Sequence, residues 1–164
     1  MTSSLPRVAH EHHERLIHFA DTLPTFGDDL MKASPDDLRP RIAEVDTFLS
    51  TTLIPHMEAA ERTLYPELER MLQNRHSMTP MRKEHTEVRA LVADFHRLGG
   101  LMEYGKPTIA HTLGLRRVVF RLYALLKIHL VEEELYVGVV NKGVTEDVAE
   151  LLATALDHPV GSVS

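Results

Sequence analysis

The sequence predicts an all-α protein, an antiparallel up-down four-helix bundle with a short extra C-terminal helix. Apolar residues recur at steps of three and four along four long segments, which is the spacing of one face of an α-helix. Strand signals are almost absent, and short connections join the four segments, as they join neighbouring antiparallel helices. The 164 residues suit a single domain, 1–164, with a core of about residues 5–140.

Clear signals bound the first two helices. The first helix is expected over residues 5–23, because Pro24 directly follows its apolar stripe. The second helix is expected over residues 35–74, with Ser34 as its N-cap. Pro55 lies inside this second segment and is expected to kink the helix or to free a backbone carbonyl.

The third and fourth helices complete the bundle. The third is expected over residues 79–98, because Gly99–Gly100 is a strong stop signal. The fourth is expected over residues 108–139, and it is predicted to be the most buried helix because its middle is apolar nearly all round. A short last helix, at about residues 145–156, is expected to pack across the end of the bundle.

Composition argues against several classes of protein. A net charge of −6, few aromatic residues and no tryptophan disfavour a nucleic-acid binder. The absence of cysteine excludes disulfide frameworks, thiolate metal sites and a cysteine nucleophile. No uncharged apolar run approaches 18 residues, so no membrane span is expected, and the first residues lack the apolar core of a signal peptide. A cytoplasmic protein is the expectation.

The distribution of histidines points to a metal. The chain has 11 histidines, and each of the four apolar stripes contains one, namely His12, His56, His85 and His129. A single histidine on an apolar face is usually a core residue whose nitrogens are hydrogen-bonded, and that alternative stays open for each. Four imidazoles in one core need partners for their nitrogens, and a metal ion supplies them. The pattern therefore favours a metal site.

Carboxylates extend this candidate ligand set. Glu133 lies one helical turn after His129, so both side chains project from the same face. One turn after His56 stands Ala60, which cannot bind a metal; Glu61 is the candidate there, if Pro55 or a local bulge turns it inward. Glu132 and Glu134 flank Glu133 on the fourth helix, and at least one of these two is expected to face solvent. Imidazole nitrogens and carboxylate oxygens together suit iron, manganese or zinc, and bridging carboxylates favour two metal ions.

Four segments between about residues 8 and 140 carry a resemblance to a known family. They are Glu11-His12-x-Glu14, His56-Met-Glu-Ala-Ala-Glu61-Arg-Thr-Leu-Tyr65-Pro66, Met81-Arg-Lys-Glu-His85 and His129-Leu-Val-Glu132-Glu133-Glu134-Leu-Tyr136. The chain resembles the hemerythrin-like proteins of the HHE cation-binding type. The resemblance implies a four-helix bundle that encloses a bridged pair of non-haem iron ions, and the ligand types leave zinc and manganese as alternatives. The metal ligands it implies are His12, His56, His85, His129 and Glu133, and Glu61 completes the predicted set as the candidate that replaces the ligand missing at Ala60.

Two departures from the family pattern bear on function. Ala60 replaces the glutamate expected one turn after His56, and Arg89 replaces a second histidine one turn after His85. A centre with fewer histidines argues against reversible O₂ carriage and for a redox or sensing role. The other histidines carry plainer interpretations, and His10, His13 and His18 are expected on the surface. Tyr65 and Tyr136 are expected to be packing residues, with a role beside iron left open.

The sequence leaves more than one function open. The first hypothesis is a di-iron protein that binds or reacts with O₂, peroxide or nitric oxide as a sensor, scavenger or store; a peroxide- or NO-consuming enzyme activity stays undecided. The second is a regulatory interaction bundle whose metal only braces the fold, with an unidentified protein partner. The third is a helical bundle without metal. A ferritin-like centre is disfavoured because no glutamate has a histidine three residues later.

Overall fold

Helices are the regular secondary structure of the part of the chain that the structure describes. This computed structural model describes the backbone of residues 5–142 and the side chains of residues 12–140. In chain order the elements are α1 (Leu5–Asp29), α2 (Pro35–Phe48), η1 (Leu49–Leu53), α3 (Ile54–Ala59), η2 (Ala60–Leu64), α4 (Tyr65–Met71), α5 (Thr79–Tyr104) and α6 (Ile109–Lys142). The predicted all-α class is confirmed. The expected helix at residues 145–156 lies outside the described residues.

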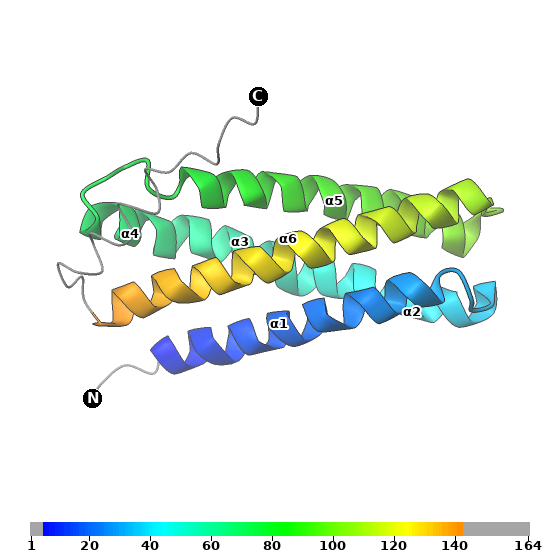
Figure 1. The fold of residues 1–164 in the computed structure, drawn as a ribbon, viewed down its shortest axis with the longest axis horizontal. Coiled ribbons are helices and arrows are strands. Elements are labelled where there is room, and N and C mark those ends of the chain that lie inside the picture. The colour runs from blue at the N-terminus through cyan, green and yellow to red at the C-terminus, as the bar shows by residue number, and fades with distance from the viewer. Residues whose placement is uncertain (1–4, 143–164) are drawn as a thin grey trace, which may run out of the picture.

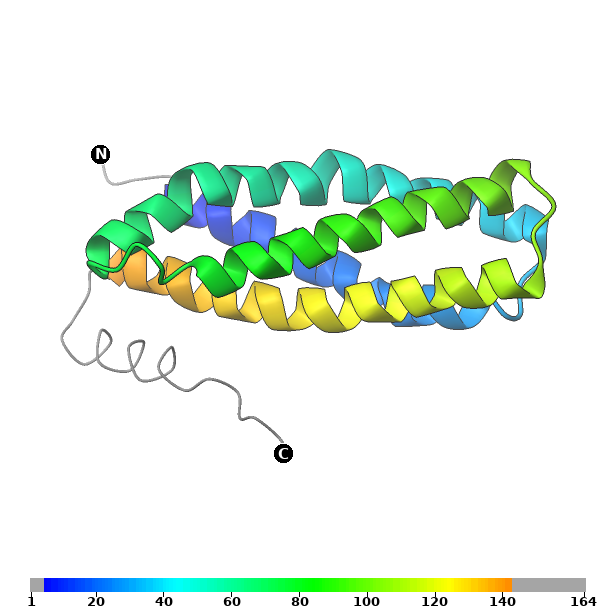
Figure 2. The same cartoon turned by 90° about the horizontal axis from the view of Figure 1, so that it is seen from above.

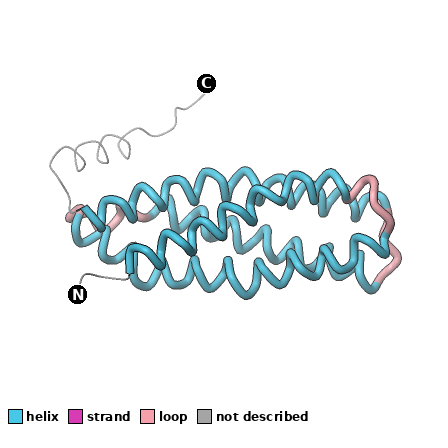
Figure 3. The backbone as a smooth tube through the Cα atoms, turned by 90° about the horizontal axis from the view of Figure 1, so that it is seen from below, coloured by secondary structure: helices cyan, strands magenta, loops and turns pink. Residues whose placement is uncertain are grey.

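Four long helical segments lie side by side along most of their length (Figures 1 and 2). The second of them is the continuous run from α2 to α4, and the others are α1, α5 and α6. Loops are confined to the ends of the segments, as the tube in Figure 3 makes plain. None of the described helices combines the length and apolar character needed to cross a membrane.

Two helices run past the stop signals that the sequence offers. The prediction that Pro24 ends the first helix was wrong, because α1 continues to Asp29. A proline inside a helix removes one hydrogen bond, and burial of Phe26 and Leu30 beyond it outweighs that loss. Likewise α5 continues through Gly99 to Tyr104. A methyl group on Gly99 would lie 2.9 Å from the Ile42 side chain, so this glycine permits close packing against α2 rather than ending the helix.

The segment from α2 to α4 contains two π-helical turns, η1 and η2. Each ends two residues before a proline. Ile54, before Pro55, donates its backbone N–H to the carbonyl five residues back, and Tyr65, before Pro66, does the same. A proline has no N–H and its ring crowds the carbonyl four residues back, and a wider turn relieves that crowding. The predicted disturbance at Pro55 is therefore a π turn.

The core is apolar except for one polar layer. Two clusters of buried apolar side chains fill the spaces between the helices, a large one and a smaller one that includes Tyr65. Among the described residues, the buried histidine and carboxylate side chains are those of His13, His85, His129 and Glu133, each at most 3% exposed. These four residues come from α1, α5 and α6.

Candidate metal centre

Glu133 of α6 is the meeting point of two groups of histidines. One group is His13 of α1, His56 of α3 and Glu133, and the other is His85 of α5, His129 of α6 and Glu133. Within each group the nitrogen and oxygen atoms that could bind a metal lie within 4.8 Å of one another. A single carboxylate therefore belongs to two clusters, each of which could hold a metal ion.

The first group gathers around one oxygen of the Glu133 carboxylate. Its Oε2 atom lies 2.9 Å from Nε2 of His13 and 2.8 Å from Nε2 of His56. The Glu133 side chain is fully buried, and those of the two histidines are 4% and 10% exposed. Two imidazole nitrogens thus approach the same carboxylate oxygen from two different helices.

The second group is completed by a phenol. Nε2 of His85 lies 3.0 Å from Nε2 of His129 and 3.0 Å from the hydroxyl oxygen of Tyr65. That hydroxyl donates to Oε1 of Glu133 at 3.0 Å. The second carboxylate oxygen therefore faces an oxygen and two nitrogens, all of them atoms that can bind a metal.

Three further carboxylates hold the outer nitrogens of the imidazoles. Nδ1 of His13 lies 2.8 Å from Glu134, Nδ1 of His85 lies 2.8 Å from Glu61, and Nδ1 of His129 lies 2.8 Å from Glu84. A carboxylate on the outer nitrogen is the usual partner of a metal-bound histidine, because it fixes the tautomer and the ring orientation. In all three the Nε2 atom is left to face the centre.

The charges of the first group are coupled. Burial alone would raise the pKa of Glu133, but hydrogen bonds from His13 and His56 hold this pKa well below its ordinary value. Burial alone would lower the pKa of His13. Its hydrogen bonds to Glu133 and Glu134 outweigh burial, and the pKa of His13 is raised above its ordinary value. Glu133 is therefore an anion in the folded chain, and the carboxylates of Glu133 and Glu134 stabilise the protonated form of His13.

The second group brings two imidazole nitrogens together with no cation among the described residues between them. An ionised carboxylate only accepts hydrogen bonds, so Glu61 and Glu84 keep the protons on the two Nδ1 atoms. The two Nε2 atoms then meet at 3.0 Å, each with a lone pair, unless a cation or a proton lies between them. Burial, followed by the neighbouring His129, lowers the pKa of His85 to about 4, which makes a proton there costly at neutral pH. A metal ion satisfies these atoms without that cost.

Tyr65 shares this environment. Burial and the negative charge of Glu133 raise the pKa of its phenol far above the ordinary value, so the metal-free chain keeps it protonated. A bound cation would act in the opposite direction and favour the phenolate.

No family model, curated protein or solved structure matches this chain.

The structure brings together four of the six residues that the sequence predicted as ligands. His56, His85, His129 and Glu133 belong to the two groups. Glu61 lies on η2, and its carboxylate holds the outer nitrogen of His85 instead of facing Glu133.

The first helix supplies a different histidine from the predicted one. His12 is half-buried and its ring lies 5.0 Å from that of His56, but it belongs to neither group among the described residues. The expectation that His13 lies on the surface was wrong, because it is 3% exposed. Leu16 lies about one helical turn from both histidines and does not distinguish them. The next buried residue, Ala20, is two full turns from His13, and the two therefore share the inner face of α1.

Three contributors to the centre were not singled out from the sequence. Tyr65 was expected to pack, with a role beside iron left open, Glu84 was not considered, and Glu134 was considered only as a neighbour of Glu133. The signal for the two carboxylates was weak, because a surface glutamate and a glutamate that holds a histidine look alike in sequence. For Tyr65 the signal was the proline after it, which marks the π turn that directs it inward.

Two pockets open beside the first group. One, of about 400 Å³, is lined by His12, Arg15, Thr51, Thr52, Pro55, His56 and Ala59. The other, of about 470 Å³, is lined by residues that include His13 and Glu134. The first group is therefore within reach of a small molecule from solvent.

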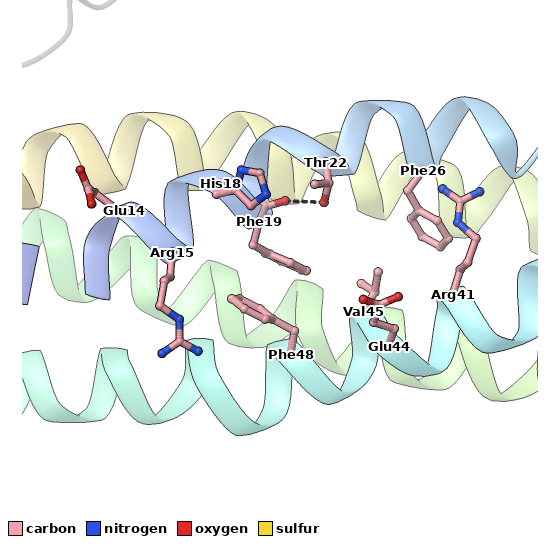
Figure 4. Close-up of a pocket in the computed structure, with 10 residues that line it drawn as sticks. All are labelled: Glu14, Arg15, His18, Phe19, Thr22, Phe26, Arg41, Glu44, Val45 and Phe48. Carbon is pink, nitrogen blue, oxygen red and sulfur yellow. Dashed lines mark hydrogen bonds between the residues drawn. The ribbon is translucent and has the colours of Figure 1, made fainter. Parts of the chain in front are cut away.

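A third pocket, between α1 and α2, lies away from the centre. Figure 4 shows Phe19 and Phe48 pointing toward one another across it, and their rings stack at 3.8 Å. Arg41 lines the same pocket of about 620 Å³ and is paired with Asp29 at 2.8 Å. This pocket contains none of the residues of the two groups.

Proposed function

We propose that this chain is a non-haem di-iron protein, an antiparallel four-helix bundle that binds or reacts with O₂, peroxide or nitric oxide. The observation that carries the proposal is the carboxylate of Glu133, which is shared by two separate pairs of imidazoles. Bridging carboxylates with nitrogen ligands on either side suit a pair of metal ions. The hemerythrin-like resemblance in the sequence leads to the same expectation.

The donor atoms divide into two sets. Nε2 of His13, Nε2 of His56 and Oε2 of Glu133 would hold one metal, and Nε2 of His85 and of His129 would hold the other with Oε1 of Glu133. The phenol oxygen of Tyr65 adds a donor to the second set. All of these are nitrogen or oxygen atoms, which favour iron, manganese or zinc over softer metals.

The surrounding residues suit a reaction with a small ligand. When bound, iron would supply the exchangeable electrons and the open coordination positions that such a ligand needs. The pocket beside His56 provides a route to one set, while His85, His129 and Tyr65 are at most 1% exposed and keep water from the other. The two metal positions are therefore expected to differ in access.

Metal analysis of fresh protein tests this proposal. Protein produced with added iron and purified without chelators should contain close to two iron ions per chain. The Glu133→Ala variant should lose both, whereas the exposed Glu87→Ala variant on α5 should lose neither. Protein that retains no metal, or a Glu133→Ala variant that retains two, would overturn it.

Ligand assays then separate the reactions. Reduced protein should change its absorption spectrum on mixing with O₂, peroxide or an NO donor, and a turnover assay on peroxide decides whether it is an enzyme. An iron-loaded protein that reacts with none of the three ligands would contradict this function and favour the second candidate described next.

That second candidate is an interaction bundle in which the metal braces the fold. An apolar stripe on the outer face of α6 favours it, because Ile128, Val131 and Leu135 are 58%, 56% and 64% exposed. These residues are spaced three and four apart and so share a helix face. Capture of a partner by the metal-loaded chain, lost in an Ile128→Glu variant, would support this function.

A further inference from the structure

The side chains of His85, Glu61 and Arg89 form a hydrogen-bonded chain that joins α5 and η2. Arg89, one turn after His85 on α5, donates from both of its terminal nitrogens to the two oxygens of Glu61, at 3.0 Å each. Glu61 in turn lies on η2, and its Oε1 is 2.8 Å from Nδ1 of His85. The side chain of His85 is fully buried, whereas those of Glu61 and Arg89 are 28% and 36% exposed.

The hydrogen-bonding capacity of these groups decides where the protons are. A guanidinium group can only donate, so Glu61 must accept both hydrogen bonds as a carboxylate. The same carboxylate cannot donate to Nδ1 of His85, and therefore Nδ1–H donates to Glu61. A neutral imidazole with its proton on Nδ1 has a lone pair on Nε2, the atom that faces Tyr65 and His129.

The two-point contact makes Glu61 different from Glu84, the carboxylate that accepts from His129. A bidentate arginine fixes the plane of a carboxylate as well as its position, which a single hydrogen bond does not. Glu84 accepts from His129 through one oxygen, and among the described residues no arginine is paired with it. At His85 the outer partner is itself held in place.

We infer that Arg89 is a positioning residue for His85, which acts through Glu61 to hold the imidazole in the tautomer that presents Nε2 to the centre. Arg89, which takes the place of a second histidine ligand on this helix, thus orients the histidine ligand His85. The value of this orientation to metal binding rests on the proposed function, whereas the tautomer can be tested without metal.

Nitrogen NMR of the metal-free chain, labelled with ¹⁵N-histidine, tests the tautomer directly. The His85 signals, assigned by their loss in a His85→Gln variant, should report a proton on Nδ1 and none on Nε2. The Arg89→Gln variant should show a mixture of both tautomers, and Arg89→Lys, which keeps the charge, should recover part of the wild-type pattern. Arg97→Gln, on the same helix but paired with Asp94, is the matched control and should leave the His85 signals unchanged. A proton on Nε2 in the wild type, or an unchanged pattern in Arg89→Gln, would overturn the inference.

Titration with Co²⁺ tests whether the two residues act as one unit. Arg89→Gln and Glu61→Gln should each weaken Co²⁺ binding by about 10-fold, the lower end of the effect of removing such an outer partner. The double variant should bind no more weakly than either single variant, because the second change removes nothing further. Losses that multiply to about 100-fold would show independent action and overturn the inference. A wild-type chain that binds no Co²⁺ but has the expected tautomer would refute the proposed metal function and leave the positioning role of Arg89 intact.

Discussion

At the scale of single residues, Glu133 balances the charges of the centre. It is a fully buried carboxylate whose two oxygens face different partners, His13 and His56 on one side and Tyr65 on the other. A buried anion is tolerated only where cations or hydrogen-bond donors surround it, and removing one member of such a set leaves the rest unbalanced. Glu133 should therefore matter for stability even without metal.

The pH dependence of stability provides a test of this charge balance. Because the pKa of Glu133 is lower in the folded chain than its ordinary value of 4.5, the carboxylate stabilises the fold above about pH 4.5. That contribution is lost as the pH falls through the folded-state pKa. The metal-free Glu133→Gln variant should be about 3 kcal/mol less stable than the wild type at pH 7.

Urea unfolding of both chains between pH 3 and pH 7 measures this difference in free energy. The difference should shrink steadily below about pH 4.5, where the unfolded chain begins to take up the proton. A difference that stays constant across the range would mean that the Glu133 charge makes no contribution.

Tyr65 makes a second prediction at this scale. The Tyr65→Phe variant keeps the buried ring but removes the hydroxyl that faces His85 and Glu133. Loss of one buried hydrogen bond should cost the metal-free chain about 1 kcal/mol. The iron(III)-loaded wild type should show a visible phenolate-to-iron absorption, and the variant should lack it. If both proteins have the same visible spectrum, Tyr65 is not a ligand of iron.

The sequence predicted the kinds of residue in the centre better than their identities. Histidine and glutamate on facing helices were expected, and His56, His85, His129 and Glu133 do come together. The choice between His12 and His13 depends on about 100° of helix rotation, which an apolar stripe with ambiguous steps does not fix. Whether a carboxylate faces a metal or the back of an imidazole depends on side-chain packing, which a single sequence does not contain.

At the scale of the elements, the π turn η2 directs residues toward the centre. Tyr65 is nine residues after His56, and in an uninterrupted α-helix the two would point in nearly opposite directions, about 180° apart. The extra residue of one π turn reduces this angle to about 80°. The buried positions record the change, because Ala60 and Tyr65 are five residues apart whereas the other buried positions of the segment are three or four apart.

The substitution Pro66→Ala tests this role of η2. Alanine restores a backbone N–H for the carbonyl of Arg62, so the helix can close a regular α-turn and Tyr65 turns away from the centre. We expect the metal-free chain to be no less stable than the wild type, while Co²⁺ affinity falls at least about 10-fold. Calorimetry and metal titration measure the two quantities separately.

Pro40→Ala is the matched control for this experiment. Pro40 also lies inside a helix, α2, but it contributes to neither histidine group. Its replacement should leave Co²⁺ affinity unchanged. An equal loss of affinity in both proline variants, or none in either, would show that the π turn does not position the centre.

At the scale of the whole molecule, the apolar core and the polar layer contribute differently to the stability of the fold. The periodicity of apolar residues predicted the all-α class and four long segments because burial of a continuous stripe dominates helix packing. It predicted helix ends poorly, since tertiary contacts of Phe26 and Gly99 outweigh local stop signals. The polar layer brings together possible metal ligands from all four segments, so a bound metal should stabilise the fold as a whole.

Chelation should therefore lower the melting temperature. A ligand at 100 times its dissociation constant adds about 2.7 kcal/mol, which for a chain of this size corresponds to roughly 5 to 10 °C. Differential scanning calorimetry before and after chelation measures the shift. The Glu133→Ala variant is the control and should melt at the same temperature in both conditions. If chelation leaves the melting temperature of the metal-loaded wild type unchanged, the metal does not stabilise the fold.

Anomalous X-ray diffraction from crystals grown with ferrous iron tests the central claim most directly. Data collected at the iron absorption edge should show two peaks inside the protein, one beside Nε2 of His13 and His56 and one beside Nε2 of His85 and His129. The Glu133 carboxylate should lie between them. No peak in this core, or a single peak that leaves one pair of imidazoles without metal, would contradict the account.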